Sequence, residues 1–175
     1  MKKFISVAFS FLLLCSVNSY AFSPIKVKFA PRSIGILTPD NELIKYADAE
    51  DVPEILYSST IIAYGMTILS FYDIDFVLKN NQAIFISKDP ISKDVIISKI
   101  ENSRTGNINI NFDAGTMGEM SPDTKIALKY INSQIILTVL TGSVYMQSNG
   151  TEFELVTGET YTHKIIKRED EEDAI

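Results

Sequence analysis

Apolar and polar residues alternate in short segments along most of the chain after residue 60, and turn-forming residues separate these segments. The clearest pair covers residues 143–147 and 152–156, on either side of Asn149 and Gly150. Successive side chains of a strand point to opposite faces, and Asn and Gly both tolerate the positive φ of a tight hairpin turn. The pattern predicts a β-hairpin.

Similar segments recur with turn signals every eight to twelve residues or so, which is typical of small antiparallel β proteins. The chain is therefore predicted to be all-β: a mainly antiparallel β-roll or sandwich, or a short β-solenoid. The other strand-like segments are residues 26–29, 34–37, 61–70, 76–78, 83–87 and 94–100. The turn signals between the later segments fall at Asp73, Asn80-Asn81, Asp89-Pro90, 102–106 and 113–115.

Residues 22–60 carry prolines that confine extended segments to sheet edges or loops. Within this region the pattern changes between residues 40 and 50. Asp40 is a suitable helix cap, Leu43 and Tyr46 would share one face, and Pro53 would end the element. We expect at most one short N-terminal helix here.

Residues 72–86 and residues 112–128 resemble each other weakly, as an internal repeat would. Each contains an acidic turn, a short strand, a polar turn and another strand. A true duplication would favour stacked or pseudo-symmetric β layers, whereas a strand-turn-strand unit also recurs by chance.

The N-terminus has the features of a secretory signal. Lys2 and Lys3 precede an apolar run over residues 4–17, and small residues then lead to a predicted cut after Ala21. The run is too short to favour a membrane span. An uncleaved anchor and a lipidated Cys15 are the alternatives. We expect a periplasmic or secreted protein with no integral membrane span after cleavage.

Charge narrows the range of partners. Removing residues 1–21 takes two lysines from the 16 basic residues and leaves 14 against 22 acidic ones, a net charge of −8. Nucleic-acid binding depends on clustered Lys and Arg, so no nucleic-acid partner is expected. Cleavage also removes Cys15, the single cysteine, which excludes disulfides and thiolate metal sites.

Glycine-led turns carry a resemblance to a known family. Residues 115–126 form a glycine-led strand, polar turn and strand, and residues 139–145 and 155–159 add a further glycine-led strand and a Gly-Glu turn. This arrangement, over about 115–161, is similar to FecR-like periplasmic domains. The resemblance implies an all-β extracytoplasmic fold, found in regulators that relay outer-membrane transport signals to a sigma factor.

Such regulators carry a sigma-binding segment and a membrane span ahead of the β domain, whereas a signal peptide precedes it here. The resemblance therefore implies a periplasmic sensing or scaffold role and not anti-sigma activity. The expected organisation is a signal peptide (1–21), an extended segment (22–60), a FecR-like β domain (61–166) and an acidic, disordered tail (167–175).

Candidate catalytic residues are few. His163 is the single histidine, so a histidine-rich metal centre cannot form within one chain. Asp73 and Asp75 would share a strand face, and Asp113 and Asp123 lie near turns, where capping explains acids most simply. We assign no catalytic, cofactor-binding or metal-binding residues and expect no enzymatic activity.

Two clusters invite a binding interpretation. The acids Asp48, Glu50, Asp51 and Glu54 could bind a cation, but a solvated face is the better interpretation. Several aromatic residues could stack on sugar rings, although core packing is favoured for them. They are Tyr57, Tyr64, Phe71, Tyr72, Phe76 and Phe85.

The sequence thus predicts a non-enzymatic β-domain protein that binds an envelope or periplasmic protein. The alternative is a small-ligand carrier with an apolar pocket, and a remote one is a hydrolase using Asp73 or His163. A carrier needs a concave cavity, whereas an interaction module needs a filled core and an exposed edge strand or apolar patch.

Overall fold

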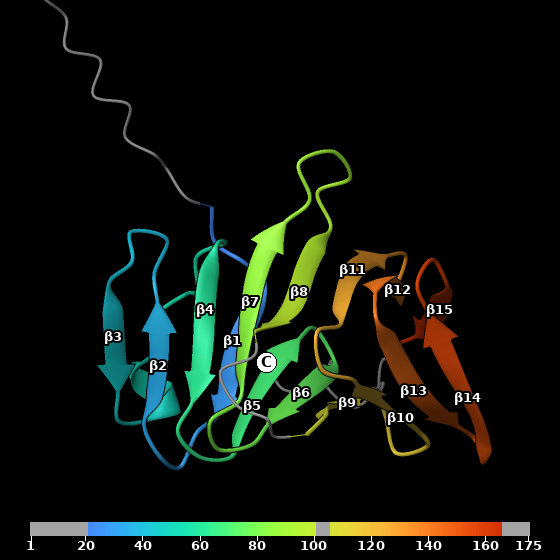
Figure 1. Cartoon of the computed structure of the whole chain (residues 1–175), viewed down its shortest axis with the longest axis horizontal. Helices are drawn as coiled ribbons and strands as arrows, with labels where there is room; N and C mark the ends of the chain where they lie inside the picture. Colours follow the sequence, from blue (N-terminus) through green and yellow to red (C-terminus); the bar gives the residue numbers. More distant parts are fainter. Residues whose placement is uncertain (1–20, 101–105, 166–175) are drawn as a thin grey trace, which may run out of the picture.

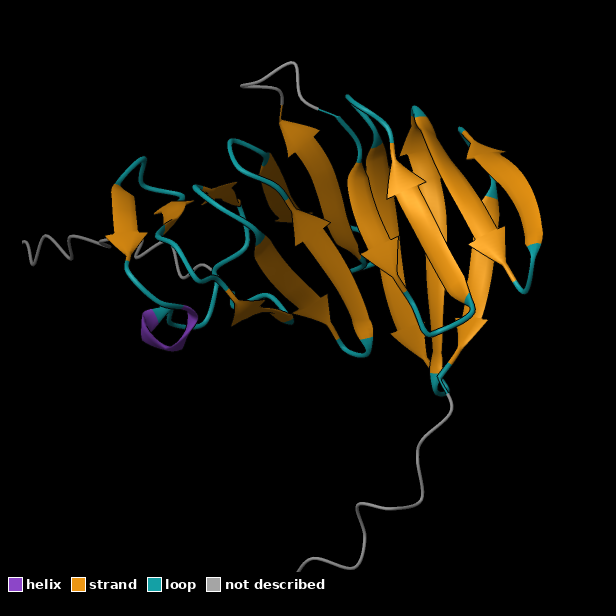
Figure 2. Ribbon diagram, turned by 90° about the horizontal axis from the view of Figure 1, so that it is seen from below, coloured by secondary structure: helices purple, strands orange, loops and turns teal. Residues whose placement is uncertain are grey.

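The computed structural model describes residues 21–100 and 106–165, and in these ranges 15 strands form two antiparallel β-sheets. The all-β prediction is confirmed, and helix is confined to one 3₁₀ turn, Ala49–Asp51 (Figure 2). In spatial order, the seven-stranded sheet contains β1 (Ile25–Phe29), β5 (Thr67–Phe71), β6 (Ile74–Leu78), β9 (Ile108–Asn111), β10 (Thr116–Met120), β13 (Ser143–Ser148) and β14 (Thr151–Val156). The eight-stranded sheet contains β15 (Thr160–Lys164), β12 (Gln134–Thr141), β11 (Lys125–Ile131), β8 (Val95–Ile100), β7 (Ala83–Lys88), β4 (Ser59–Ala63), β2 (Ile34–Leu37) and β3 (Leu43–Tyr46).

From β5 onward the chain lays down two strands in one sheet and then crosses to the other. The hairpins β5–β6, β9–β10 and β13–β14 belong to the seven-stranded sheet, and β7–β8 and β11–β12 to the eight-stranded sheet. From β9 onward each hairpin pairs with the preceding hairpin of its own sheet, as β9 does with β6 and β11 with β8. The chain therefore advances along the long axis from β3 at one end to β14 and β15 at the other (Figure 1).

This path divides the chain into four-strand units. β5–β8 and β9–β12 are two complete units, and β13–β15 supply three strands of a third. The two segments of the weak internal repeat occupy equivalent positions in the first two units. Residues 72–86 and 112–128 each run from the turn of the first hairpin to the first strand of the second.

The core lies between the two sheets. Strands β4, β5 and β6 each bury their first, third and fifth side chains, as an alternating strand with one inward face must. In β12 the inward residues Ile135, Leu137 and Val139 are fully buried. Each such side chain contributes about 1.5–3 kcal/mol of stability. The core therefore provides stability without any disulfide.

The predicted hairpin at residues 143–156 is confirmed. Ser148 pairs with Thr151, and the two residues between them, Asn149 and Gly150, have φ angles of 49° and 79°. Both central residues of a type I′ turn need positive φ, which is why Asn-Gly favours this connection. The local sequence therefore sets the register of β13 against β14.

Two local predictions were wrong. The helix expected over residues 40–50 is absent: Leu43–Tyr46 forms β3, paired with β2, and helix is limited to Ala49–Asp51. The tight turn at Asn41, which has a φ of 62°, returns the chain beside β2. The apolar stretch 61–70 is also not one strand, because the chain crosses between sheets at Gly65.

A hydrogen-bonded contact fixes the crossing between β12 and β13. Thr124 is fully buried, and its hydroxyl donates to the carbonyl oxygen of Ser143 (3.0 Å) and accepts from the Ser143 N–H (3.1 Å). Gly142 lies against it with a φ of 80°, and a Cβ there would lie 2.9 Å from the Cα of Thr124. The connection from β10 to β11, which contains Thr124, therefore contacts the connection from β12 to β13 at Gly142.

Replacing Gly142 by Ala tests this contact. Gly150 is the matched control, because its φ is 79° and a Cβ there meets nothing within 4 Å. Positive φ alone costs about 1–2 kcal/mol at either position. We expect Gly142→Ala to lower the free energy of unfolding by about 2 kcal/mol more than Gly150→Ala, because of the added overlap. Urea denaturation measures both; equal losses would contradict the close contact.

Candidate functional site

Two pockets, both lined by described residues, lie at the molecular surface, because packed side chains fill the core. The buried side chains of both sheets form one continuous cluster. One pocket, of about 460 Å³, is lined by residues 28–31 and 48–51 and so includes Asp48, Glu50 and Asp51, all exposed. Within residues 21–100 and 106–165, no group of three or more His, Cys, Asp or Glu is placed to hold a metal ion. Glu54, the fourth acid of the cluster, is exposed as well.

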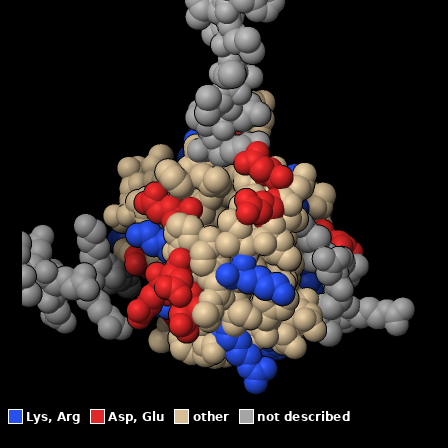
Figure 3. Space-filling view, turned by 90° about the vertical axis from the view of Figure 1, so that its left-hand side faces the viewer, with Lys and Arg blue, Asp and Glu red and all other residues tan. Residues whose placement is uncertain are grey.

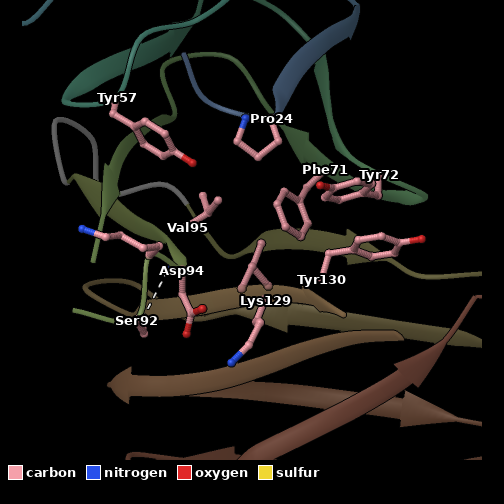
Figure 4. A pocket seen from close by; sticks show the side chains of 11 residues that line it. Pro24, Tyr57, Phe71, Tyr72, Ser92, Asp94, Val95, Lys129 and Tyr130 are labelled. Atoms are coloured by element: carbon pink, nitrogen blue, oxygen red, sulfur yellow. Dashed lines mark hydrogen bonds between the residues drawn. The ribbon is translucent and has the colours of Figure 1, made fainter. Parts of the chain in front are cut away.

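A smaller pocket, of about 240 Å³, has walls of tyrosine (Figure 4). Tyr72 lies in the β5–β6 turn and Tyr130 near the end of β11, and their rings stack with centroids 4.0 Å apart and planes 15° from parallel. Phe71, fully buried, meets Tyr72 edge-on at 4.9 Å. The remaining lining residues are Pro24, Tyr57, Ser92, Lys93, Asp94, Val95, Leu128 and Lys129.

Tyr57 forms the opposite wall, and Figure 4 shows its hydroxyl directed toward the middle of the pocket. Partial burial, and to a lesser degree the neighbouring Tyr72, raises the pKa of Tyr57. The ammonium of Lys88 lies 5.5 Å from the centroid of the Tyr57 ring, within cation–π range. This wall therefore offers a neutral hydroxyl at ordinary pH.

The β7–β8 turn holds Ser92 and its neighbours against the pocket. The Asp89 carboxylate accepts hydrogen bonds from the backbone N–H groups of Ile91 and Ser92, each at 2.7 Å. These two bonds are the main reason that the pKa of Asp89 is lowered, because they favour the charged carboxylate. The predicted turn at Asp89-Pro90 thus has an identifiable side-chain cap.

The predicted aromatic set divides among three environments. Phe71 and Phe76 belong to the core, as core packing predicts, whereas Tyr57 and Tyr72 line the pocket. Tyr64 and Phe85 are half-buried, and the Lys45 ammonium lies 4.9 Å from the Tyr64 ring centroid. The aromatic residues singled out from the sequence do not include Tyr130. It stacks on Tyr72 only because β11 carries it there, and no local pattern in the sequence marks that contact.

The structure does not assemble the candidate acids and the histidine into one site. Asp73 lies exposed in the β5–β6 turn, and Asp75 on β6 pairs with Lys28 at 2.9 Å. Asp113 caps the β9–β10 turn by accepting from the N–H of Gly115 (2.8 Å). One of its oxygens also lies 3.7 Å from Nε2 of His163.

Asp123 occupies the turn before β11, with a φ of 57°. His163 is nearly buried on β15 and packs beside the ring of Phe112 at 5.3 Å. The contacts that these acids and His163 make are turn hydrogen bonds, a surface ion pair and side-chain packing. They bring no nucleophile and base together.

An aromatic cluster fills the β14–β15 end, the end of the sandwich formed by these two strands. The Tyr161 ring lies 5.5 Å from that of Phe112 and 6.0 Å from that of Phe153. Tyr161 and Phe153 are only partly buried, unlike the residues of the middle of the core. The end of the sandwich is thus closed by apolar rings that solvent still reaches.

The backbone of β15 is paired on one side only in the described chain. Ile165 donates its N–H to the carbonyl oxygen of Ser133, which places Tyr161 and His163 in the hydrogen-bonded positions opposite β12. In an antiparallel ladder the intervening residues direct their N–H and C=O groups away from that partner. Thr160, Thr162 and Lys164 therefore present an unpaired row at the sheet edge.

The neighbouring edge strand, β14, is acidic. Glu152 and Glu154 are exposed, and Glu159 follows in the turn to β15. A hydrogen bond to Glu152, more than any other cause, raises the pKa of Tyr145 on β13. Acids also gather at the opposite end of the molecule, the β1–β3 end, which faces the viewer in Figure 3. Both ends of the sandwich are thus rich in negative charge.

Comparisons with family models, curated proteins and solved structures found no match for the chain. The described residues contain no helix with the length and apolar character needed to cross a membrane. The FecR-like resemblance therefore rests on residues 115–161 of the sequence alone.

Titration of Tyr57 tests the burial of the pocket wall. The raised pKa means that the folded state keeps the Tyr57 proton at pH values where the unfolded chain, with a pKa near 10.0, has lost it. Stability from this difference is present below pH 10 and declines as pH rises toward the folded pKa. We expect Tyr57→Phe to make the alkaline loss of stability less steep.

The measurement is thermal unfolding as a function of pH, with NMR titration of the Tyr57 ring in the wild-type chain. Tyr72→Phe is the control, because it removes the smaller cause of the shift and leaves most of it in place. An ordinary pKa at Tyr57 would contradict the buried position of its hydroxyl.

Proposed function

We propose that the chain is a non-enzymatic periplasmic or secreted binding module that engages an envelope or periplasmic protein through its β14–β15 end. The observation that carries this proposal is the unpaired backbone of Thr160, Thr162 and Lys164 beside a solvent-accessible aromatic cluster. Proteins normally shorten, charge or cover such edges, because they pair readily with another strand. An uncovered edge beside apolar surface is suited to recognition.

The filled core also favours a protein-binding module over a small-ligand carrier. A carrier encloses most of its ligand in a cavity, often of about 300–1,000 Å³. Here the inward faces are occupied by packed side chains, and the two pockets, of about 240 Å³ and 460 Å³, are open surface hollows that enclose no ligand-sized space within the core. The signal-like residues 1–21 and the FecR-like segment support delivery to the periplasm or outside the cell.

Charge indicates the kind of partner. Glu152, Glu154 and Glu159 flank the open edge, where Lys164 is the basic residue of β15. Complementary charge raises association rates and suppresses unsuitable partners. A protein with a basic surface beside its binding segment therefore fits best.

A second candidate, binding of a small ligand, is favoured by the tyrosine pocket. Stacked Tyr72 and Tyr130 present preoriented rings, and the hydroxyl of Tyr57 could hydrogen-bond a polar group. An apolar or sugar-like compound that copurifies with the chain, and is lost in Tyr130→Ala, would favour this candidate.

Capture experiments test the main proposal. The tagged chain of residues 22–175 is incubated with periplasmic extract, and bound proteins are quantified. Reversing Glu152 and Glu154 to Lys should reduce capture at least tenfold, because basic surfaces would then be repelled. The matched control reverses Glu50 and Glu54, which are exposed elsewhere, and should retain capture. Equal capture by both double variants, with unchanged melting temperatures, would overturn the proposal.

A further inference from the structure

The structure also indicates how such a partner would bind, an inference that rests on the proposed function. We propose that the partner contributes a β-strand of about five residues that pairs antiparallel with the free edge of β15, matching the length of Thr160–Lys164. The strand would have apolar side chains at alternate positions. It would extend the eight-stranded sheet by one strand.

The four-strand units supply the first argument. In the first unit β7 is followed by its hairpin partner β8, and in the second β11 is followed by β12. β15 stands where β7 and β11 stand, pairing with the preceding unit through β12. No strand of the described residues lies beyond it. A partner strand would take the place that β8 and β12 take in the complete units.

Backbone chemistry supplies the second argument. The outward N–H and C=O groups of Thr160, Thr162 and Lys164 alternate at the spacing of an antiparallel ladder. Side chains of β15 protect this edge poorly: Thr160 and Thr162 are uncharged, and Lys164 stands at the end of the strand. By contrast, β14 carries two charged residues, Glu152 and Glu154, on its exposed face. β15 is therefore the more receptive strand at this end.

The aromatic cluster determines which side chains fit. Residues opposite Tyr161 and His163 on an added strand would point inward, toward the partly exposed Tyr161 and Phe153 rings. The preceding unit shows the suitable chemistry, because β12 fills the same layer with Ile135 and Leu137. A branched apolar residue at every second position would cover the rings.

Charge argues against a second copy of this chain as the donor. The free strand at the other end of the same sheet is β3, and exposed acids, among them Glu42 and Glu50, surround it. Placing this end against Glu152 and Glu154 would juxtapose like charges (Figure 3). Residues 166–175 lie outside the described chain, and their sequence places five acids in a row at 169–173, without the alternation that the edge requires.

A designed peptide tests the proposal directly. The probe is the β12 sequence, residues 134–141, with two lysines at each end and a fluorescent label. The control peptide replaces the residues equivalent to Ile135, Leu137 and Val139, which face the core in β12, by Ser and so removes the apolar face. Fluorescence anisotropy with the chain of residues 22–175 should show saturable binding of the probe and at least tenfold weaker binding of the control.

Three protein variants separate backbone pairing from other effects. Thr162→Pro removes one outward N–H and leaves the bonds of Tyr161 and His163 to β12 in place, so binding should fall at least tenfold. Thr162→Val keeps that N–H and should bind like wild type. Lys45→Pro makes the equivalent change on β3, where Lys45 pairs with Gly35, and should also bind like wild type.

The outcomes are distinct from those of the capture experiment. Capture that depends on Glu152 and Glu154 but is unaffected by Thr162→Pro would overturn strand addition and leave the proposed function standing. A wild-type dimer that Thr162→Pro abolishes, measured by size-exclusion chromatography with light scattering, would assign the edge to a second copy. Peptide affinity that rises at least tenfold on deletion of residues 167–175 would assign it to the chain's own tail. Either result overturns the proposal.

Discussion

Burial of one face of every strand is the constraint on which this fold depends. Each sheet is apolar on the side that meets the other sheet, and the alternation in β4, β5, β6 and β12 follows from that requirement. A one-residue slip would expose a whole row of apolar side chains to solvent. The core thereby holds the register of strands that are only four to eight residues long.

The second constraint is the pairing of buried polar groups, which most of them achieve; among the described residues the buried hydroxyls of Ser59 and Thr67 are exceptions. Thr124 bonds both backbone groups of Ser143 where the chain changes sheets, and the buried Gln82 donates to the carbonyl oxygens of Gly106 and Asn107. Crossings between the sheets are therefore tied together by side chains, while strand ladders pair the backbone elsewhere. β15 is one of four edge strands, with β1, β3 and β14, and recognition is proposed for it because partly exposed aromatic rings lie beside it.

Local sequence predicted much of the secondary structure. The Asn149-Gly150 hairpin and the segments now seen as β1, β2, β7 and β8 were predicted within one residue at either end. Where the prediction failed, a distant partner decided the outcome. Leu43–Tyr46 is a strand because β2 lies beside it, and no periodicity over four residues distinguishes that from one helical turn.

By itself, the sequence determined the all-β class, the positions of most turns and the need for a core without disulfides, because alternation, turn residues and cysteine content are local properties. The tertiary structure alone decided which strand is left at an edge and which aromatic rings meet. Tyr72 and Tyr130 stack although 57 intervening residues separate them, and Tyr161 is placed beside Phe112 and Phe153 by sheet order. Such contacts depend on long-range pairing, which no short segment encodes.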